Sequence, residues 1–229
     1  MTSKPRVVLP ARAQAGFTLI ELLVVIGIIA VMAGVIGLAL GQGDRGTSLR
    51  TAQGTLSSLL SGARAQAALN QTRAAIFVNA EPTSDGFMHE FRIAVETSAN
   101  NWQVRGDPLV LPRGLFLVPA KGVFLSPSQV QFNGGWDSGS WSIYPSTNTY
   151  DDTPLRLKDS ANNDISSENY HELVSFTVRG TTQSGQIVVA IAELQADGSI
   201  VYNDPALVRG MVVSTYGVAS FVNEAEAFK

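Results

Sequence analysis

The sequence of 229 residues contains no cysteine and only two histidines. Without cysteine the chain has no disulfide framework, no thiolate metal site and no cysteine nucleophile, and its redox compartment is left open. Each histidine precedes a glutamate, as His89-Glu90 and His171-Glu172. Adjacent residues on a strand point to opposite faces, so neither pair is arranged for acid–base catalysis.

Motifs for phosphate binding and nucleophilic catalysis are missing as well. Gly134-Gly135 lacks the downstream lysine and hydroxyl residue of a phosphate-binding loop, and no serine nucleophile elbow occurs. With no catalytic constellation in the sequence, we expect a protein that is not an enzyme and that holds no metal and no cofactor.

Positive charge is also scarce outside the N-terminus. The formal net charge is -3 at pH 7, and the first sixteen residues contribute Lys4, Arg6 and Arg12 without any acidic group. Removing those sixteen residues would leave a side-chain charge of -6. An acidic chain is a poor candidate for binding nucleic acid through its overall charge, so we expect no nucleic-acid partner.

What the sequence does contain is one long apolar run, residues 22–40, in which every residue is apolar or glycine. As a helix this run is about 28 Å long, close to the hydrocarbon thickness of a bilayer. Basic residues precede it and Asp44 follows it. The positive-inside rule then predicts a single-pass inner-membrane anchor, with the N-terminus cytoplasmic and the remaining chain outside.

A cleaved secretory signal is the first alternative, because Ala39-Leu40-Gly41 offers small residues after a basic start. The apolar core of such a signal is about 7–15 residues long, shorter than this run. The run is also preceded directly by a carboxylate, Glu21. An ionised carboxylate inside a membrane costs about 2.5–3.5 kcal/mol at the centre and less near the edge, so Glu21 is either solvated at the boundary or compensated by a partner.

Residues 16–26 read GFTLIELLVVI. This segment resembles the class III signal of type IV prepilins and of type II secretion pseudopilins. The resemblance implies that prepilin peptidase cleaves between Gly16 and Phe17 and that Phe17 is then N-methylated. It also implies that Glu21 meets the new N-terminal amine of a neighbouring subunit during assembly, and paired charges are far less costly to bury than one alone.

After Gly41-Gln42-Gly43-Asp44, which we interpret as a flexible break, apolar residues recur at helical spacing. The predicted amphipathic stripe is Leu49, Ala52, Leu56, Leu59, Leu60, Ala63 and Ala67. Residues 59–67, LLSGARAQA, followed by Arg73 and a strand, resemble the H-type minor pseudopilins and their FimT-like relatives. In pilins such a helix continues the membrane helix and lies on a sheet.

Beyond Arg73 the pattern changes to short β-rich runs bounded by glycine, proline, asparagine or aspartate. The predicted strands are 74–79, 87–96, 102–105, 115–118, 130–132, 173–179, 186–193, 199–202 and 207–215. Asp197-Gly198 predicts a hairpin with a two-residue loop. Residues 130–135 also resemble the strand and turn that precede the C-terminal hairpin in this family.

Residues 133–172 are polar and without a clear period, and we interpret them as an extended loop or insertion. Four acids within this stretch could supply oxygen ligands for calcium, although their spacing fits no EF-hand loop: Asp151, Asp152, Asp159 and Asp164. FimT-like subunits are associated with DNA-uptake pili, which makes DNA contact a minor hypothesis for four scattered arginines: Arg50, Arg64, Arg73 and Arg105.

The expected fold is α+β and pilin-like, with a long N-terminal helix packed on an antiparallel sheet. The expected domains are a leader at 1–16, a transmembrane or filament-core helix at 17–40, an amphipathic helix at 41–72 and a β-rich periplasmic domain at 73–229. The leading hypothesis is a minor pseudopilin at or near the tip of a type II secretion pseudopilus. Its expected partners are prepilin peptidase, other pseudopilins or pilins, the inner membrane and the secretion assembly platform.

Two alternatives remain open at this stage. A type IV pilin subunit for adhesion, motility or DNA uptake would use the same scaffold, although the absence of a C-terminal cysteine pair departs from many pilins. A membrane-anchored periplasmic binding domain would need an anchor but neither cleavage nor assembly.

Overall fold

The computed structural model describes residues 19–119, 129–133, 136, 156–165, 170–224 and 228, without the side chains of residues 21 and 31–45. The chain divides into two compact units, Met1–Asp44 and Arg45–Lys229. The first unit contributes the start of helix α1, and the second contains the remainder of that helix together with all the strands.

Helix α1 is assigned from Leu19 to Asn70. Its backbone is helical through residues 41–44, so the predicted flexible break does not interrupt the helix. Each glycine there costs about 1 kcal/mol of helix propensity relative to alanine, which is too little to end a helix by itself. The boundary between the two compact units nevertheless falls directly after Asp44.

The stripe of apolar residues predicted on the second part of α1 is buried without exception. The seven residues are 0–2% exposed: Leu49, Ala52, Leu56, Leu59, Leu60, Ala63 and Ala67. Between them the helix turns small or polar residues outward, among them Gly54, Ser58 and Ser61. The second part of α1 therefore packs on the domain through one face, as the 3.6-residue period of its apolar residues predicts.

Thirteen strands are assigned in the described part of the second unit. They are β1 (Ala74–Asn79), β2 (Glu90–Ser98), β3 (Asn101–Val110), β4 (Leu115–Leu117), β5 (Val130–Phe132), β6 (Arg156–Lys158), β7 (Asp164–Ile165), β8 (Tyr170–Phe176), β9 (Gly185–Ile191), β10 (Glu193–Leu194), β11 (Ile200–Tyr202), β12 (Val208–Val213) and β13 (Ala219–Val222). They form sheets ordered β7-β6-β3-β2-β1-β8, β13-β12-β9-β4 and β10-β11-β5.

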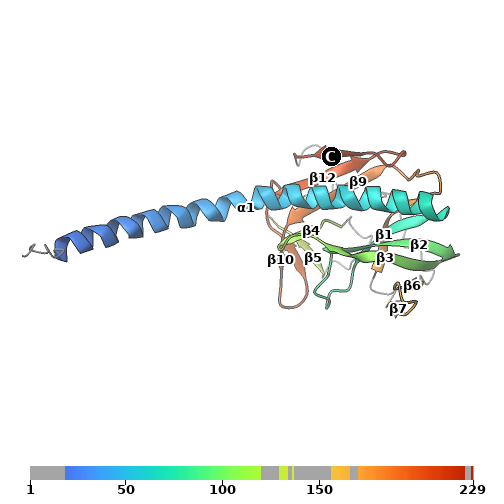
Figure 1. Ribbon diagram of the computed structural model, residues 1–229, viewed down its shortest axis with the longest axis horizontal. Helices are drawn as coiled ribbons and strands as arrows, with labels where there is room; N and C mark the ends of the chain where they lie inside the picture. The colour runs from blue at the N-terminus through green and yellow to red at the C-terminus, as the bar shows by residue number, and fades with distance from the viewer. Residues whose placement is uncertain are drawn as a thin grey trace, which may run out of the picture. The chain divides into compact units, whose positions relative to one another are not determined.

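The expected α+β class with an antiparallel-rich sheet domain is confirmed. Most strand pairs are antiparallel, while β3 with β6 and β5 with β11 are parallel. Figure 1 shows the second part of α1, from Arg45 on, crossing in front of the sheets, with β9 and β12 along one side and β1 to β3 along the other. Two contacts fix this position. A Cβ on Gly62 would lie 3.0 Å from Cδ1 of Ile93 in β2, and Gln53 Nε2 donates to the carbonyl of Gly210 in β12 at 2.9 Å.

Two hydrophobic cores share strand β1. Ala74, Ile76 and Val78 belong to the main core with the α1 stripe. Ala75 and Phe77 point to the other face, into a smaller core with Trp102, Val104, Leu157 and Tyr170. All six residues of β1 are consequently buried. Burial on both faces explains why residues 74–78 of this interior strand are all apolar, without alternating polar residues.

The predicted loop or insertion at 133–172 is wrong in part. The structure places two short strands there, β6 and β7, and starts β8 at Tyr170. β6 pairs with the edge of β3, and its Leu157 fills the smaller core. Strands of two or three residues are too short to show a period, so their sequence resembles a loop. Much of the remaining stretch lies outside the described residues.

Two turns also differ from expectation. Five residues, 195–199, lie between β10 and β11. The N–H of Gln195 donates to the carbonyl of Ser199, so the turn closed by this pair has three residues, not two, and Gly198 takes the left-handed conformation with φ 84°. Strand β13 was missed altogether, since the last predicted strand ended at residue 215. Gly217, with φ 71°, makes the same kind of three-residue turn between β12 and β13.

The packing of α1 can be tested at Leu56, which belongs to the main core and is only 1% exposed. We expect Leu56→Ala to lower the free energy of unfolding by about 2–5 kcal/mol, because the removed methyl groups leave a cavity. Urea unfolding of the full chain in detergent measures the effect. Ser58→Ala, on the exposed face of the same helix, is the matched control and should change stability by less than about 0.5 kcal/mol. Equal effects of both variants would contradict the assigned face.

Candidate functional site

The residues predicted to take part in processing and assembly lie at or before the N-terminal limit of the described residues, which begin at Leu19. Gly16 and Phe17 are outside the described residues, and so is the side chain of Glu21. Their roles in cleavage, methylation and assembly therefore stay predictions. The nearest described segment is the beginning of α1, residues 19–30.

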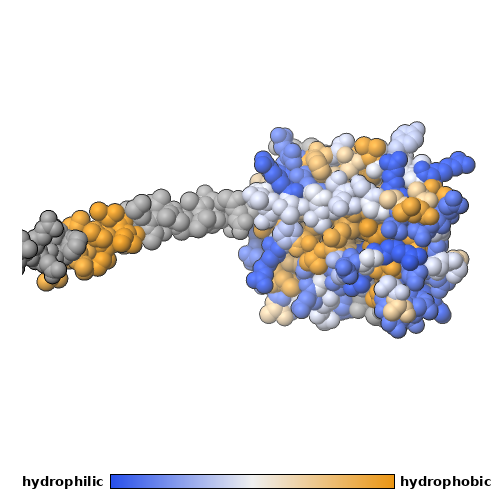
Figure 2. Space-filling view, viewed as in Figure 1, coloured by the Kyte–Doolittle hydropathy of each residue, from blue (hydrophilic) through white to orange (hydrophobic). Residues whose placement is uncertain are grey.

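This beginning of α1 exposes large apolar side chains on every face. Leu19 and Ile20 are 88% and 71% exposed. The next large apolar residues are at least half exposed: Leu22, Leu23, Val24, Val25, Ile26, Ile28 and Ile29. Successive residues of a helix point about 100° apart, so five in a row cover its whole circumference. Figure 2 shows this segment as continuous orange. A helix that is apolar all round belongs in lipid or among other helices.

Gly27 lies within this apolar segment, and apart from its chain neighbours and the backbone of its own helix no atom lies within 4 Å of the position where its Cβ would be. A glycine in an apolar helix lets a second helix approach closely. The described part of the chain contains no helix that is both long enough and apolar enough to cross a membrane. The predicted span, residues 17–40, extends beyond that part.

Comparison with protein families bears directly on this segment. Residues 11–37 match the family model described as the Prokaryotic N-terminal methylation motif. The match supports a type IV pilin-like protein. The matched residues contain Gly16, Phe17 and Glu21, and the motif implies processing by prepilin peptidase and assembly with other pilins. No curated protein and no solved structure matches the chain.

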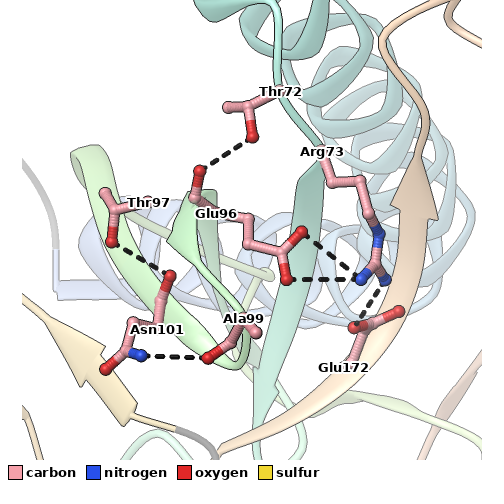
Figure 3. Close-up of polar contacts among 7 residues, drawn as sticks. All are labelled: Thr72, Arg73, Glu96, Thr97, Ala99, Asn101 and Glu172. Carbon is pink, nitrogen blue, oxygen red and sulfur yellow. Dashed lines mark hydrogen bonds and ion pairs between the residues drawn. The ribbon is translucent and has the colours of Figure 1, made fainter.

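A polar cluster fixes the point where α1 passes into the sheet (Figure 3). The guanidinium of Arg73 lies 3.4 Å from Oε2 of Glu96 and 3.8 Å from Oε2 of Glu172. It also lies 5.3 Å from the ring centroid of Trp102. The hydroxyl of Thr72 donates to the carbonyl of Glu96 at 2.8 Å. The residues after α1 are thereby attached to both neighbours of β1, since Glu96 is in β2 and Glu172 in β8.

The hairpin between β2 and β3 lies beside this cluster and is closed by its own side chains. Asn101 Nδ2 donates to the carbonyl of Ala99 at 2.9 Å, and the hydroxyl of Thr97 donates to the carbonyl of Asn101 at 3.1 Å. Figure 3 draws these contacts next to Glu96. These contacts satisfy several polar groups at one end of a sheet, while the indole N–H of Trp102 is buried without a hydrogen-bond partner among the described residues.

The four arginines considered for DNA contact do not form one group. Arg50 and Arg64 stand fourteen positions apart on α1, or about 21 Å along its axis. Arg73 is ion-paired to two carboxylates, and Arg105 lies in β3 opposite Ile93. This separation leaves a DNA-binding interpretation without a basic surface built from the predicted residues.

Of the two histidine–glutamate neighbours, His171 and Glu172 both lie in β8, whereas His89 precedes β2 and only Glu90 belongs to that strand. Glu90 Oε1 accepts hydrogen bonds from Arg92 Nε at 2.9 Å and from the Tyr170 hydroxyl at 2.8 Å. Burial raises the pKa of Tyr170, and its hydrogen bond to Glu90 adds to the increase. His89 instead has its Nδ1 3.0 Å from the carbonyl oxygen of Phe87. Burial lowers the pKa of His171, which favours the neutral ring.

Two of the four acids considered for calcium are described, and both have local partners. The carboxylate of Asp159 accepts hydrogen bonds from the N–H and Nδ2 of Asn163 at 2.8 and 2.9 Å, which lowers the pKa of Asp159. Asp164 lies 4.0 Å from the ammonium of Lys158. Across the described ranges no three metal-binding side chains come together. Asp151 and Asp152 lie outside those ranges.

A structural role for Arg73 predicts a modest, measurable loss on truncation. We expect Arg73→Ala to lower the free energy of unfolding by about 1 kcal/mol, since the half-exposed ion pairs and the contact with Trp102 each contribute a fraction of this. Urea unfolding at low and high salt measures it, and the loss should shrink in high salt. Arg113→Ala, at an exposed position, should leave stability unchanged. If Arg73→Ala and Arg113→Ala changed the free energy of unfolding equally, the ion pairs of Arg73 would not stabilise the connection between α1 and β1.

Proposed function

We propose that this chain is a minor pseudopilin of a type II secretion system, cleaved by prepilin peptidase and assembled at or near the tip of a periplasmic pseudopilus. Its role is structural and not catalytic. In this account the chain waits in the inner membrane with its N-terminus cytoplasmic and its sheet domain in the periplasm, and assembly then helps to export folded proteins.

The observation that carries the proposal is the methylation motif at residues 11–37, joined to a helix whose described start is apolar on every face. Such a helix needs lipid before assembly and other helices after it. The second part of the same helix supports the proposal differently, because a buried stripe on an antiparallel-rich sheet domain is the arrangement expected of a pilin-like subunit. The H-type resemblance of residues 59–67 favours the secretion assignment.

Glu21 is proposed to pair with the amine created at Phe17 of a neighbouring subunit. We expect Glu21→Gln to be cleaved normally but to leave the membrane for the filament poorly, because breaking a buried ion pair costs about 3–5 kcal/mol. The ratio of chain in sheared filaments to chain in membranes measures this. Glu224→Gln, at an exposed position in the second unit, is the matched control. Normal incorporation of the Glu21 variant would exclude the pairing.

The secretion role has its own test in cells lacking this chain. We expect deletion to reduce export of type II substrates, which should accumulate folded in the periplasm, and the unaltered gene should restore export. Substrate activity in medium and periplasm measures the effect. Unchanged export together with loss of surface fibres, twitching or DNA uptake would favour the type IV pilin alternative instead.

A further inference from the structure

Two tight turns lie side by side after the ends of β8 and β12. Gly180 and Gly217, one in each turn, take the left-handed conformation with φ 71°. A Cβ on Gly217 would lie 3.3 Å from the carbonyl oxygen of Gly180, and the N–H of Thr182 donates to the carbonyl of Thr215 at 2.9 Å. The second part of α1 adjoins the first turn, because Nε of Arg64 lies 2.8 Å from the position of a Cβ on Gly180. The two turns and this part of the helix therefore form one continuous surface.

This surface carries exposed apolar side chains beside two exposed arginines. Val178, Tyr216 and Val218 are 46%, 70% and 56% exposed. Arg64 and Arg179 are exposed as well, and neither has an ion pair or hydrogen bond within the part of the chain that the structure describes. Tyrosine and arginine are among the residues that most often dominate the binding energy of protein interfaces. We name these five residues the basic platform.

The basic platform belongs to a part of the domain that has no acidic residue. Three segments build this part, and none of them contains aspartate or glutamate: residues 45–72, 173–192 and 205–223. They are in contact with one another, since Nε2 of Gln53 in α1 donates to the carbonyls of Gly210 and Val222, and Arg64 lies against the turn at Gly180. All nineteen acidic residues of the chain lie elsewhere. The charge of the platform is therefore opposite to the net charge of the chain.

The carboxylates at the adjoining ends of β2 and β8 do not neutralise the platform. Glu172 pairs with Phe77 across the strands, and Glu96 stands two positions after Ala94 in β2. Both glutamates therefore share a face of the sheet with the smaller core, opposite to the face on which α1 packs. There each of them forms an ion pair with Arg73. The positive charge of the platform is left for a partner.

We propose that the basic platform docks on an acidic, partly apolar surface of another pilin-like subunit. Arg64 and Arg179 pair with carboxylates of that subunit, while Tyr216 and the two valines cover its apolar side chains. Complementary charge selects this partner and steers its approach. The inference rests on the proposed function, in which the neighbours of this chain are other pseudopilins.

The composition of the platform favours a protein partner over nucleic acid. Three of its five side chains are an aromatic and two valines, which suit the apolar core of a protein interface. Two arginines contact few phosphates, whereas binding of nucleic acid by charge depends on many such contacts. The side-chain charge of -6 after removal of residues 1–16 opposes nucleic-acid binding further.

Photochemical cross-linking in cells identifies the partner. The full-length chain with benzoylphenylalanine in place of Tyr216 is expressed together with its assembly system and illuminated, and the products are identified by mass spectrometry. We expect a product with a different protein that carries an N-terminal methylation motif, joined at a peptide that contains aspartate or glutamate. Benzoylphenylalanine in place of Leu194, which is 46% exposed in β10, is the matched control and should not label that peptide. Products with a second copy of this chain, nucleic acid or lipid alone would overturn the proposal.

Charge reversal tests the role of the arginines in the same contact. Arg179→Glu should lower the yield of the cross-linked product about tenfold, and arginine in place of the acidic residue of the labelled peptide should restore it. Arg156→Glu is the control and should leave the yield unchanged, because Arg156 is exposed in β6, three strands away from β8 in the same sheet. Equal yields with and without Arg179→Glu would overturn the proposal.

The outcome also separates this inference from the proposed function. Chains that are cleaved and support export, yet give no product from position 216 that depends on Arg179, would refute the docking alone. Chains that keep residues 1–16 would refute the assembly route itself. Cleavage and membrane content of every variant are compared with the unaltered chain, so that a folding defect is not mistaken for a lost contact.

Discussion

The burial of one apolar stripe of α1 is the constraint on which the rest of the structure depends. Seven leucines and alanines at helical spacing seal the main core, and the helix contacts both larger sheets through Gly62 and Gln53. Removing that face from water gains about 25 cal/mol per Å² of apolar area. In the described start of the same helix, residues 19–30, the large apolar side chains are exposed instead. A helix that is apolar all round belongs in lipid or among other helices.

Much of this arrangement could be predicted because it depends on periodicity. The α1 stripe and the central strand β1 were both correctly predicted, since a 3.6-residue period and a buried apolar run are local signals. β6, β7 and β13 were missed, because two to four residues are too few to show a period. β6 pairs with β3, about fifty-five residues earlier, whereas β7 and β13 pair with the strands directly before them, β6 and β12. The sheet of β5, β10 and β11 depends on a parallel pairing between residues seventy positions apart, Val130 and Ile200, which no local pattern contains.

In the candidate site, too, local motifs could be predicted from the sequence, whereas contacts between distant segments could not. Gly16, Phe17 and Glu21 were found by motif, and the match to the methylation motif at residues 11–37 supports a pilin-like protein. The turns at Gly180 and Gly217 could not be joined from sequence, because their contact depends on how β8 and β12 end at one edge. Arg64 is an example: in sequence it is one scattered arginine, whereas in the fold its side chain lies against the turn at Gly180, 116 positions later.

The central claim is that this chain is processed and assembled as a pilin-like subunit, and the mature N-terminus tests it most directly. Intact mass and N-terminal sequence are determined for the chain from membranes of cells with and without prepilin peptidase. The account predicts a chain that begins at methylated Phe17 when the peptidase is present, and an uncleaved chain for Gly16→Val or without the enzyme. A mature protein that keeps Met1 in cells with active peptidase would contradict it.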